Sequence, residues 1–315
     1  MKKLSVIYNV TSACPWDCSF CCMSAMRKKD NDELSCKEKI AVVDMIAELS
    51  KTRDVRCDIS GGELFTDLRH MELLRRLSDS IGRDKLGISI SGAYLDENIV
   101  KELSMLINDV ELTMDCAPSL SYPSRPKGYH EVAARAAVLL KEHNVKVGIQ
   151  TVLTRDNCNI EMMEEQLKWM CEHHIDSWSF IKFFPVGRGY NHPEKAITDE
   201  EWLWYQANLE RRVCLHKSEA PKLDYHYLMP NHIKSSAECR CVKHSIGILP
   251  NGLVTSCFWG LNDKRQPLDP RFELGKVPEE KLSDILTNDK AKYWENHIHS
   301  CCLFREECRN EPLLA

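Results

Sequence analysis

The sequence predicts an α/β protein whose parallel sheet forms an open, partial (β/α)6 TIM-like barrel, followed by a small C-terminal α+β module. Short β-branched runs alternate with longer amphipathic segments from the start of the chain to about residue 184. This alternation gives about six β-α units, which are too few for a closed eight-fold barrel. Beyond residue 184 the alternation stops and a hairpin pattern and a cysteine-rich tail follow, which indicates the second module.

The elements of the barrel follow from the spacing of apolar residues. Strands are expected where β-branched residues gather between turn signals, over 4–10, 55–59, 86–90, 110–114, 145–153 and 177–184. Helices are expected over 35–50, 67–81, 96–107, 129–144 and 160–174, where apolar residues recur at helical spacing. Loops at the carboxyl ends of the strands are then expected to carry the function.

The second module begins after a further helix over 199–215. The polar and aromatic stretch 224–227 is interpreted as a connection, so we expect a barrel domain over 1–215 and a second domain over 216–315. Runs 246–249 and 253–256 flank Pro250-Asn251-Gly252, and Asn-Gly is a strong hairpin signal. Two short helices are expected over 279–286 and 290–297.

Composition excludes several classes of function. A formal net charge of −5 provides no basic field, so nucleic acid is not expected as a partner. The apolar run at the start is too short for a signal peptide and no 18-residue apolar segment exists, so we expect a cytoplasmic protein without membrane spans. Sixteen cysteines without an export signal indicate metal or cluster ligation, and their two groupings indicate two sites.

The first group is Cys14, Cys18 and Cys21, with Phe20 just before the last cysteine. Thiolates are the usual protein ligands of iron–sulfur clusters, and three of them can hold three corners of a cubane [4Fe–4S] cluster. The fourth iron is then open to a ligand that is not protein. The alternative is zinc, but zinc sites usually take cysteines in pairs, and no pairing partner lies nearby.

At this loop the sequence resembles the radical S-adenosylmethionine (AdoMet) superfamily, whose open iron binds AdoMet. The resemblance implies a one-electron donor such as flavodoxin or ferredoxin, reductive cleavage of AdoMet to a 5′-deoxyadenosyl radical, and hydrogen abstraction from a substrate. Gly61, Gly62 and Glu63 follow the second strand and match the family motif that holds the AdoMet amino group. Phe20 and Ser91 are also expected at AdoMet, although Ser91 lies where the family often has asparagine.

The resemblance extends to the mouth of the barrel. Asp115 matches a family strand that ends in aspartate, and the alternative is a helix-capping or turn residue. Cys116 follows it and is a candidate hydrogen-atom donor, a role found in some epimerising members; otherwise it is a small buried apolar residue. Arg188 resembles a family turn near the substrate, or it is a surface arginine.

The second cysteine group resembles the SPASM and twitch modules of the same superfamily. Cys241 is followed by ten residues, Gly252, four residues and Cys257, and the tail contains a C-x5-C pair. Two further SPASM cysteine positions hold His299 and Pro312, so one auxiliary [4Fe–4S] cluster is expected. Its expected ligands are Cys239, Cys257, Cys302 and Cys308, with Cys241 and Cys301 as substitutes, and the alternative is a structural zinc.

The resemblance defines the reaction type better than the substrate. The first hypothesis is maturation of a ribosomally made peptide by crosslinking, epimerisation or residue oxidation, which the tail favours. The second is a twitch-type dehydrogenase that oxidises an alcohol of a sugar or cyclitol. A zinc-bound scaffold or peptide-binding module would explain the tail but not Gly61-Gly62-Glu63.

Overall fold

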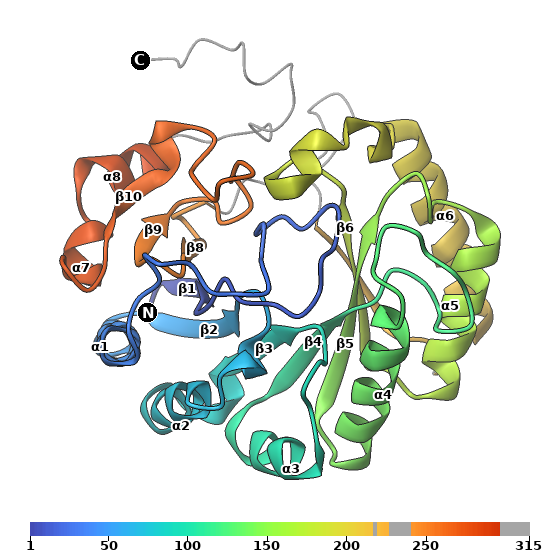
Figure 1. Cartoon of the computed structure of the whole chain (residues 1–315), viewed down its shortest axis with the longest axis horizontal. Helices are drawn as coiled ribbons and strands as arrows, with labels where there is room; N and C mark the ends of the chain where they lie inside the picture. The colour runs from blue at the N-terminus through green and yellow to red at the C-terminus, as the bar shows by residue number, and fades with distance from the viewer. Residues whose placement is uncertain (217–218, 227–240, 297–315) are drawn as a thin grey trace.

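The fold is described from a computed structural model, which covers residues 1–216, 219–226 and 241–296. Over these residues one sheet has ten strands in the order β10-β9-β8-β1-β2-β3-β4-β5-β6-β7 (Figure 1). The strands from β8 to β7 run parallel, whereas β9 and β10 are antiparallel to their neighbours. The predicted α/β class with an open, parallel barrel is therefore confirmed.

Most strands and helices lie where the sequence predicts them, with ends shifted by a few residues, whereas the strands over 222–226 and 273–276 were not predicted. The strands are β1 Lys3–Asn9, β2 Asp54–Ser60, β3 Leu86–Ile90, β4 Asp109–Thr113, β5 Lys146–Leu153, β6 Ser177–Lys182, β7 Lys222–His226, β8 Ser245–Ile248, β9 Leu253–Thr255 and β10 Glu273–Lys276. The helices are α1 Cys36–Ser50, α2 His70–Ile81, α3 Glu97–Leu106, α4 Tyr129–Glu142, α5 Ile160–Glu172, α6 Asp199–His216, α7 Leu282–Ile285 and α8 Asp289–Asn296.

The sequence led us to interpret residues 224–227 as a connection. This interpretation was wrong for residues 224–226, because they belong to strand β7. This strand pairs in parallel with β6, with Ser177 opposite Lys222, and forms a seventh strand at the edge of the barrel. Its core-packing residues Leu223 and Tyr225 alternate with Lys222 and Asp224. Charged residues are common on edge strands, where they discourage pairing with other chains, and this explains the misleading polar composition.

The predicted hairpin is confirmed, and it extends the barrel sheet. β8 and β9 are antiparallel, and β8 also pairs in parallel with β1, with Ser5 opposite Ser245. Gly252 forms the turn at a φ of +84°, and a Cβ there would lie 2.0 Å from the Val277 carbonyl oxygen. The turn therefore requires glycine. Figure 1 shows β8 and β9 beside β1, on the side of the sheet opposite β6.

The hydrophobic core lies between the sheet and the surrounding helices. On β2, Val55, Cys57 and Ile59 are buried and belong to the same core as Val43 and Ile46 of α1. The helix itself begins at Ser35, whose side chain accepts a hydrogen bond from the Glu38 backbone in a capping box. Successive strand residues point to opposite faces of the sheet, so the residues between these buried ones point into the barrel.

The interior of the barrel is polar. Glu111 accepts hydrogen bonds from Gln150 Nε2 at 2.7 Å and from Ser179 Oγ at 2.7 Å. Arg56 forms ion pairs with Asp58 and Asp109, each at 2.7 Å. Closed eight-fold barrels instead fill this space with branched apolar side chains. A polar interior suits a ligand with hydrogen-bonding groups.

In the described ranges, the helices lack the combination of length and apolar composition needed to cross a bilayer.

Burial of Glu111 gives the fold a pH dependence. Burial raises the pKa of Glu111 to about 7, so the buried carboxyl contributes stability below its unfolded pKa that is lost as the pH rises through 7. The substitution Glu111→Gln removes this loss of stability. Between pH 6 and pH 8 we therefore expect the free energy of unfolding of the variant to rise by about 1 kcal/mol relative to that of the wild type, which corresponds to about 2 °C in melting temperature. Melting of both proteins at the two pH values measures this gain. An equal difference in melting temperature between the two proteins at both pH values would contradict the raised pKa of Glu111.

Candidate active site

The loop with the first three cysteines packs directly on the Gly-Gly-Glu loop. Both loops lie at the carboxyl ends of neighbouring strands, β1 and β2. Gly62 N donates to Thr11 O at 2.7 Å, and Glu63 N donates to Ala13 O at 2.8 Å. A Cβ at Gly62 would lie 2.3 Å from the Ala13 carbonyl oxygen, and one at Gly61 would lie 2.6 Å from that of Thr11. The paired glycines therefore permit this close backbone approach.

Cys14, Cys18 and Cys21 gather at this rim of the barrel. Cys14 and Cys18 are buried and Cys21 is half-buried. Burial raises the pKa of Cys14 to about 12, and the neighbouring Cys21 and Cys18 thiols contribute to the rise. Among the described residues, no three His, Cys, Asp or Glu side chains are grouped to hold a single metal ion. A cubane binds each thiolate through a different iron, and three thiols on one loop meet that requirement.

Arg188 braces the cysteine loop. Its Nε donates to Cys18 O at 2.9 Å, its Nη1 donates to Ala25 O at 2.6 Å, and its backbone N donates to Cys21 O at 3.0 Å. The preceding Gly187 has a φ of +55°, and a Cβ there would lie 2.4 Å from the same Cys21 oxygen. The sequence placed Arg188 near the substrate or on the surface. The structure shows that Arg188 is half-buried and binds the backbone of the cysteine loop, and its position near a substrate stays a prediction.

Glu63 and Ser91 are brought together, as expected. Glu63 is 1% exposed. Glu63 Oε2 accepts hydrogen bonds from Ser91 N at 2.9 Å and from Ser91 Oγ, and Trp16 Nε1 donates to Ser91 Oγ at 2.9 Å. Burial raises the pKa of Glu63 to about 7, against the hydrogen bonds from Ser91 that lower it. Trp16, which sequence reasoning did not assign, thus joins the cysteine loop to the carboxylate.

A buried ion pair stabilises both the cysteine loop and the Gly-Gly-Glu loop. Glu33 and Lys39 are nearly inaccessible and their charged atoms lie 2.7 Å apart. The second oxygen of Glu33 accepts hydrogen bonds from Thr11 Oγ1 at 3.0 Å and from Ser12 N at 2.9 Å. Burial raises the pKa of Glu33, but the hydrogen bonds from Lys39 and Ser12 outweigh it and leave the pKa below its usual range. The Glu33 carboxylate therefore stays ionised at neutral pH.

His70 extends this pair to the Gly-Gly-Glu loop. Its Nε2 lies 3.1 Å from Lys39 Nζ, and its Nδ1 lies 2.8 Å from Leu64 O. Because the ammonium donates to Nε2, the proton of the neutral ring is on Nδ1, which donates to Leu64 O. Burial lowers the pKa of His70, in agreement with a neutral ring. Sequence reasoning missed Glu33, Lys39 and His70, because their spacing has no metal or motif signature.

Asp115 and Phe20 meet through Arg125. Asp115 is 1% exposed, and its Oδ2 accepts a hydrogen bond from Arg125 Nε at 2.6 Å. The guanidinium also lies over the Phe20 ring at 4.5 Å and over the Tyr129 ring at 4.7 Å. Burial raises the pKa of Asp115, but the Arg125 charge outweighs it and holds the pKa below its usual range. Asp115 Oδ1 accepts from Val152 N at 2.8 Å, so the residue ties β4 to β5 and does not cap a helix.

Cys116 is fully buried beside this ion pair. Its Sγ lies 3.5 Å from His130 Nδ1, and it packs in a cluster with Phe20, Tyr122 and Phe183. Burial raises the pKa of Cys116 to about 12, so the side chain is a thiol at neutral pH. Because Phe20 belongs to the cysteine loop, Cys116 lies next to that loop.

The auxiliary site is described only in part. Cys241 precedes β8 and Cys257 follows β9, so both lie at the open end of the hairpin, opposite the Gly252 turn. The side chain of Thr255 holds the backbone of Cys257, since Thr255 Oγ1 accepts from Cys257 N at 3.3 Å and donates to Cys257 O at 3.1 Å. The other expected ligands and the substitute lie outside the described residues: Cys239, Cys301, Cys302 and Cys308.

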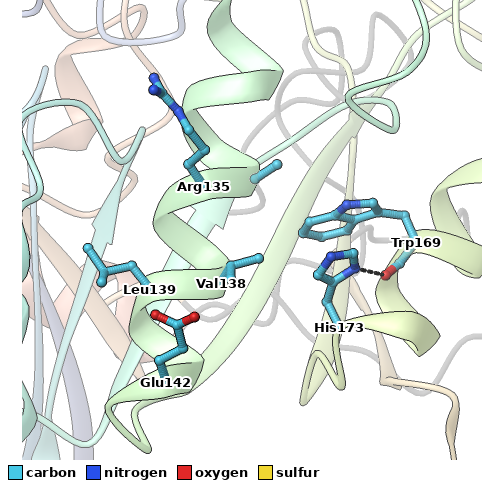
Figure 2. Close-up of a pocket in the computed structure, with 7 residues that line it drawn as sticks. Arg135, Val138, Leu139, Glu142, Trp169 and His173 are labelled. Atoms are coloured by element: carbon cyan, nitrogen blue, oxygen red, sulfur yellow. Dashed lines mark hydrogen bonds between the residues drawn. The ribbon is translucent and has the colours of Figure 1, made fainter.

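Two hollows lie on the helical layer. One, of about 360 Å³, is lined by Pro15 and Trp16 of the cysteine loop together with residues 92–95 and one side of α4. The other, of about 310 Å³, lies between α4 and α5 (Figure 2). There Trp169 stacks on His173 with ring centroids 4.4 Å apart, and Glu142 marks the carboxyl end of α4. The two hollows share Arg135 and Leu139 of α4 in their linings, so they adjoin each other along this helix.

Comparisons with known proteins agree with this geometry. The sequence model of the radical SAM superfamily, where SAM denotes AdoMet, matches residues 8–186, and the model of the SPASM iron–sulfur cluster-binding domain matches residues 239–310. The first match covers more than half of the chain. The chain therefore belongs to the radical SAM superfamily, whose cofactors are AdoMet and [4Fe–4S] clusters. No curated protein matches the chain.

Several solved structures share the fold at low sequence identity. SuiB of Streptococcus suis bound to the precursor peptide SuiA has a TM-score of 0.73 and 18% identity, over 92% of this chain and 65% of that chain. The chain thus spans less than two thirds of SuiB. Native anSMEcpe with bound AdoMet has a TM-score of 0.68 and 17% identity, over 92% of this chain and 82% of that chain.

The buried ion pair gives a stability prediction. Lys39→Met leaves the Glu33 carboxylate buried without its cation, and we expect a loss of about 3–5 kcal/mol in the free energy of unfolding. The double variant Lys39→Met/Glu33→Gln removes the unpaired charge and should recover much of that loss. Lys51→Met is the control, because Lys51 pairs with Glu48 on the surface and should change stability by about 0.5 kcal/mol or less. Urea denaturation measures all three, and equal effects of Lys39→Met and Lys51→Met would refute the assignment.

Glu63 gives a prediction for AdoMet binding. If the ionised carboxylate accepts a hydrogen bond from the AdoMet amino group, affinity should rise with pH through the pKa of about 7. The ionised fraction changes about tenfold between pH 6 and pH 8, and the dissociation constant should fall by a similar factor. Glu63→Gln removes this dependence and leaves only the titration of the ligand itself. Calorimetry on the cluster-loaded protein measures both, and parallel pH profiles would contradict the role of Glu63.

Proposed function

We propose that the protein matures a ribosomally made peptide by radical chemistry that begins with hydrogen abstraction. The observation that carries this proposal is the SPASM match over 239–310 beside an AdoMet-dependent barrel. The fold likeness to SuiB, which is described with a bound precursor peptide, supports a peptide over other substrates. The open, polar interior of the barrel supports a substrate with many hydrogen-bonding groups, as a peptide backbone has.

The cysteine and Gly-Gly-Glu loops form the proposed cofactor site. Cys14, Cys18 and Cys21 would hold a [4Fe–4S] cluster, which together with AdoMet supplies a hydrogen-abstracting radical. Gly61 and Gly62 let the second loop approach the cysteines, as their contacts with Thr11 and Ala13 support. Glu63 would accept from the amino group of AdoMet, and Ser91 and Phe20 would form adjoining walls.

Asp115 and Cys116 are the proposed residues on the substrate side. Asp115 orients Arg125 against Phe20 and so shapes the wall next to the cysteine loop. Cys116 would give a hydrogen atom to a substrate radical, which requires a thiol rather than a thiolate. Its raised pKa and its position against Phe20 support this role.

The second cysteine group is proposed to bind one auxiliary [4Fe–4S] cluster. Cys241 and Cys257 lie at the same end of the hairpin, which supports a shared site. The proposed ligands are Cys239, Cys257, Cys302 and Cys308, with Cys241 and Cys301 as substitutes. A one-electron donor such as flavodoxin or ferredoxin is the proposed partner. Oxidation of an alcohol in a sugar or cyclitol is the alternative reaction, and the hydrogen-bonding groups of Glu111, Gln150 and Ser179 would suit its hydroxyl groups.

Anaerobic reconstitution tests the proposal. We expect about eight irons per chain, as two cubane clusters require, and 5′-deoxyadenosine after addition of AdoMet and dithionite. Cys18→Ala should abolish 5′-deoxyadenosine formation. The control is Cys36→Ala, at the start of α1, which should retain it because Cys36 lies outside both cysteine groups.

The same assay separates the two substrate classes. A ribosomally made peptide should stimulate 5′-deoxyadenosine formation and emerge crosslinked, epimerised or oxidised. Stimulation by a sugar or cyclitol alone would favour the dehydrogenase. Zinc without iron, or iron without cleavage of AdoMet, would overturn both and leave a metal-bound binding protein.

A further inference from the structure

A positively charged segment follows the cysteine loop on the surface. Met26, Arg27, Lys28 and Lys29 are all exposed, and Met26 is 45% exposed despite its apolar side chain. We call these four residues the basic patch. The loop 262–266 packs against this segment, because Arg265 Nη1 donates to Ser24 O at 2.7 Å and Arg265 pairs with Asp30. This loop adds the exposed Lys264 and the exposed Asp263 to the margin of the patch.

The cations of the basic patch are free of ion pairs in the part of the chain that the structure describes. Within the described residues, Arg27, Lys28 and Lys29 form no ion pair, whereas the acidic residues that follow them are engaged elsewhere. Asp30 pairs with Arg265, Asp32 bonds to Asn251, and Glu33 pairs with Lys39. The three consecutive cations lie on a chain with a formal net charge of −5. Such a field attracts an acidic partner.

Backbone hydrogen bonds connect the basic patch directly to the cysteines. Cys14 N donates to Met26 O at 2.6 Å, and Met26 N donates to Ser12 O at 3.0 Å. Ala25, next to Met26, donates from its backbone N to Cys21 Sγ at 3.5 Å. The exposed patch is therefore one hydrogen bond away from Cys14 and close to the sulfur of Cys21. Short covalent and hydrogen-bonded connections of this kind allow rapid electron transfer.

We propose that the basic patch is the docking surface for an acidic one-electron donor protein. This inference rests on the proposed function, in which such a donor supplies electrons to the cluster. The cations steer the acidic partner, and the exposed Met26 provides an apolar contact at the point nearest to Cys14. The donor loses one electron at this contact, and the iron–sulfur group held by the cysteine loop gains it. No other oxidant or reductant is needed.

A charge-reversal experiment tests the docking surface. The patch variant is Lys28→Glu/Lys29→Glu, and the matched control is Lys101→Glu/Lys168→Glu, which has the same net charge but places it on the exposed faces of α3 and α5. The probes are a reduced acidic flavodoxin and a reduced acidic ferredoxin, mixed anaerobically with the cluster-loaded protein. Bleaching of the cluster absorbance in a stopped-flow instrument gives the second-order rate constant of reduction.

We expect the patch variant to be reduced about tenfold more slowly than the control variant at low ionic strength, about 20 mM. Screening at about 300 mM salt should narrow the difference to about twofold. Formation of 5′-deoxyadenosine with dithionite should stay unchanged, because this small reductant needs no docking surface. Equal rates for the two variants, or reduction of the wild type by dithionite but by neither donor protein, would overturn the proposal.

If the basic patch binds a peptide substrate instead of a donor protein, the same assays give a different result. If the patch variant weakens the binding of a peptide substrate while its reduction by the donor proteins is normal, the surface belongs to the peptide and the proposal fails. Absence of AdoMet cleavage by the wild type with dithionite would instead refute the proposed function itself. The two failures are therefore separable in one set of assays.

Discussion

The Glu33 carboxylate is the group on which the geometry of the rim depends. One oxygen binds Lys39 of α1, and the other binds Thr11 and Ser12 just before the first cysteine. Through Lys39 and His70 the same network reaches the carbonyl of Leu64, just after Glu63. A buried ion pair tolerates little movement, because a shift leaves a charge without its partner in a dry environment. Two loops that belong to different strands thereby share one support.

Above this support, cationic side chains fix the remaining faces of the cysteine loop. Arg188 holds the carbonyl groups of Cys18 and Ala25. Arg125 lies on the Phe20 ring and is held by Asp115. Both arginines come from loops at the carboxyl ends of later strands, β6 and β4. The loop is thus positioned by residues distributed over most of the barrel, and its geometry depends on the whole sheet.

The sequence predicted most of the elements because their apolar periodicity is strong. It placed Glu63 and Ser91 at one ligand through the family resemblance, and the structure joins the two side chains by a hydrogen bond. The prediction failed at β7 although Leu223 and Tyr225 alternate with Lys222 and Asp224, because the polar composition of this edge strand was interpreted as a connection. The pairing of β8 with β1 could not be read from the sequence, because a hairpin pattern does not state which free edge it joins. Glu33, Lys39 and His70 were missed for a related reason: their chemistry arises only when three separate segments pack together.

The position of β8 beside β1 also bears on how the chain folds. Ser5 lies opposite Ser245, so one edge of the first strand stays uncovered until the last quarter of the protein has been synthesised. Contacts between such distant segments close slowly, since a long loop must be ordered before the pairing stabilises it. During translation β1 therefore depends on β2 alone, with an open hydrogen-bonding edge next to the segment that carries Cys14, Cys18 and Cys21. Assistance by chaperones, or delayed loading of iron and sulfide until the hairpin has joined the sheet, would protect this edge from aggregation.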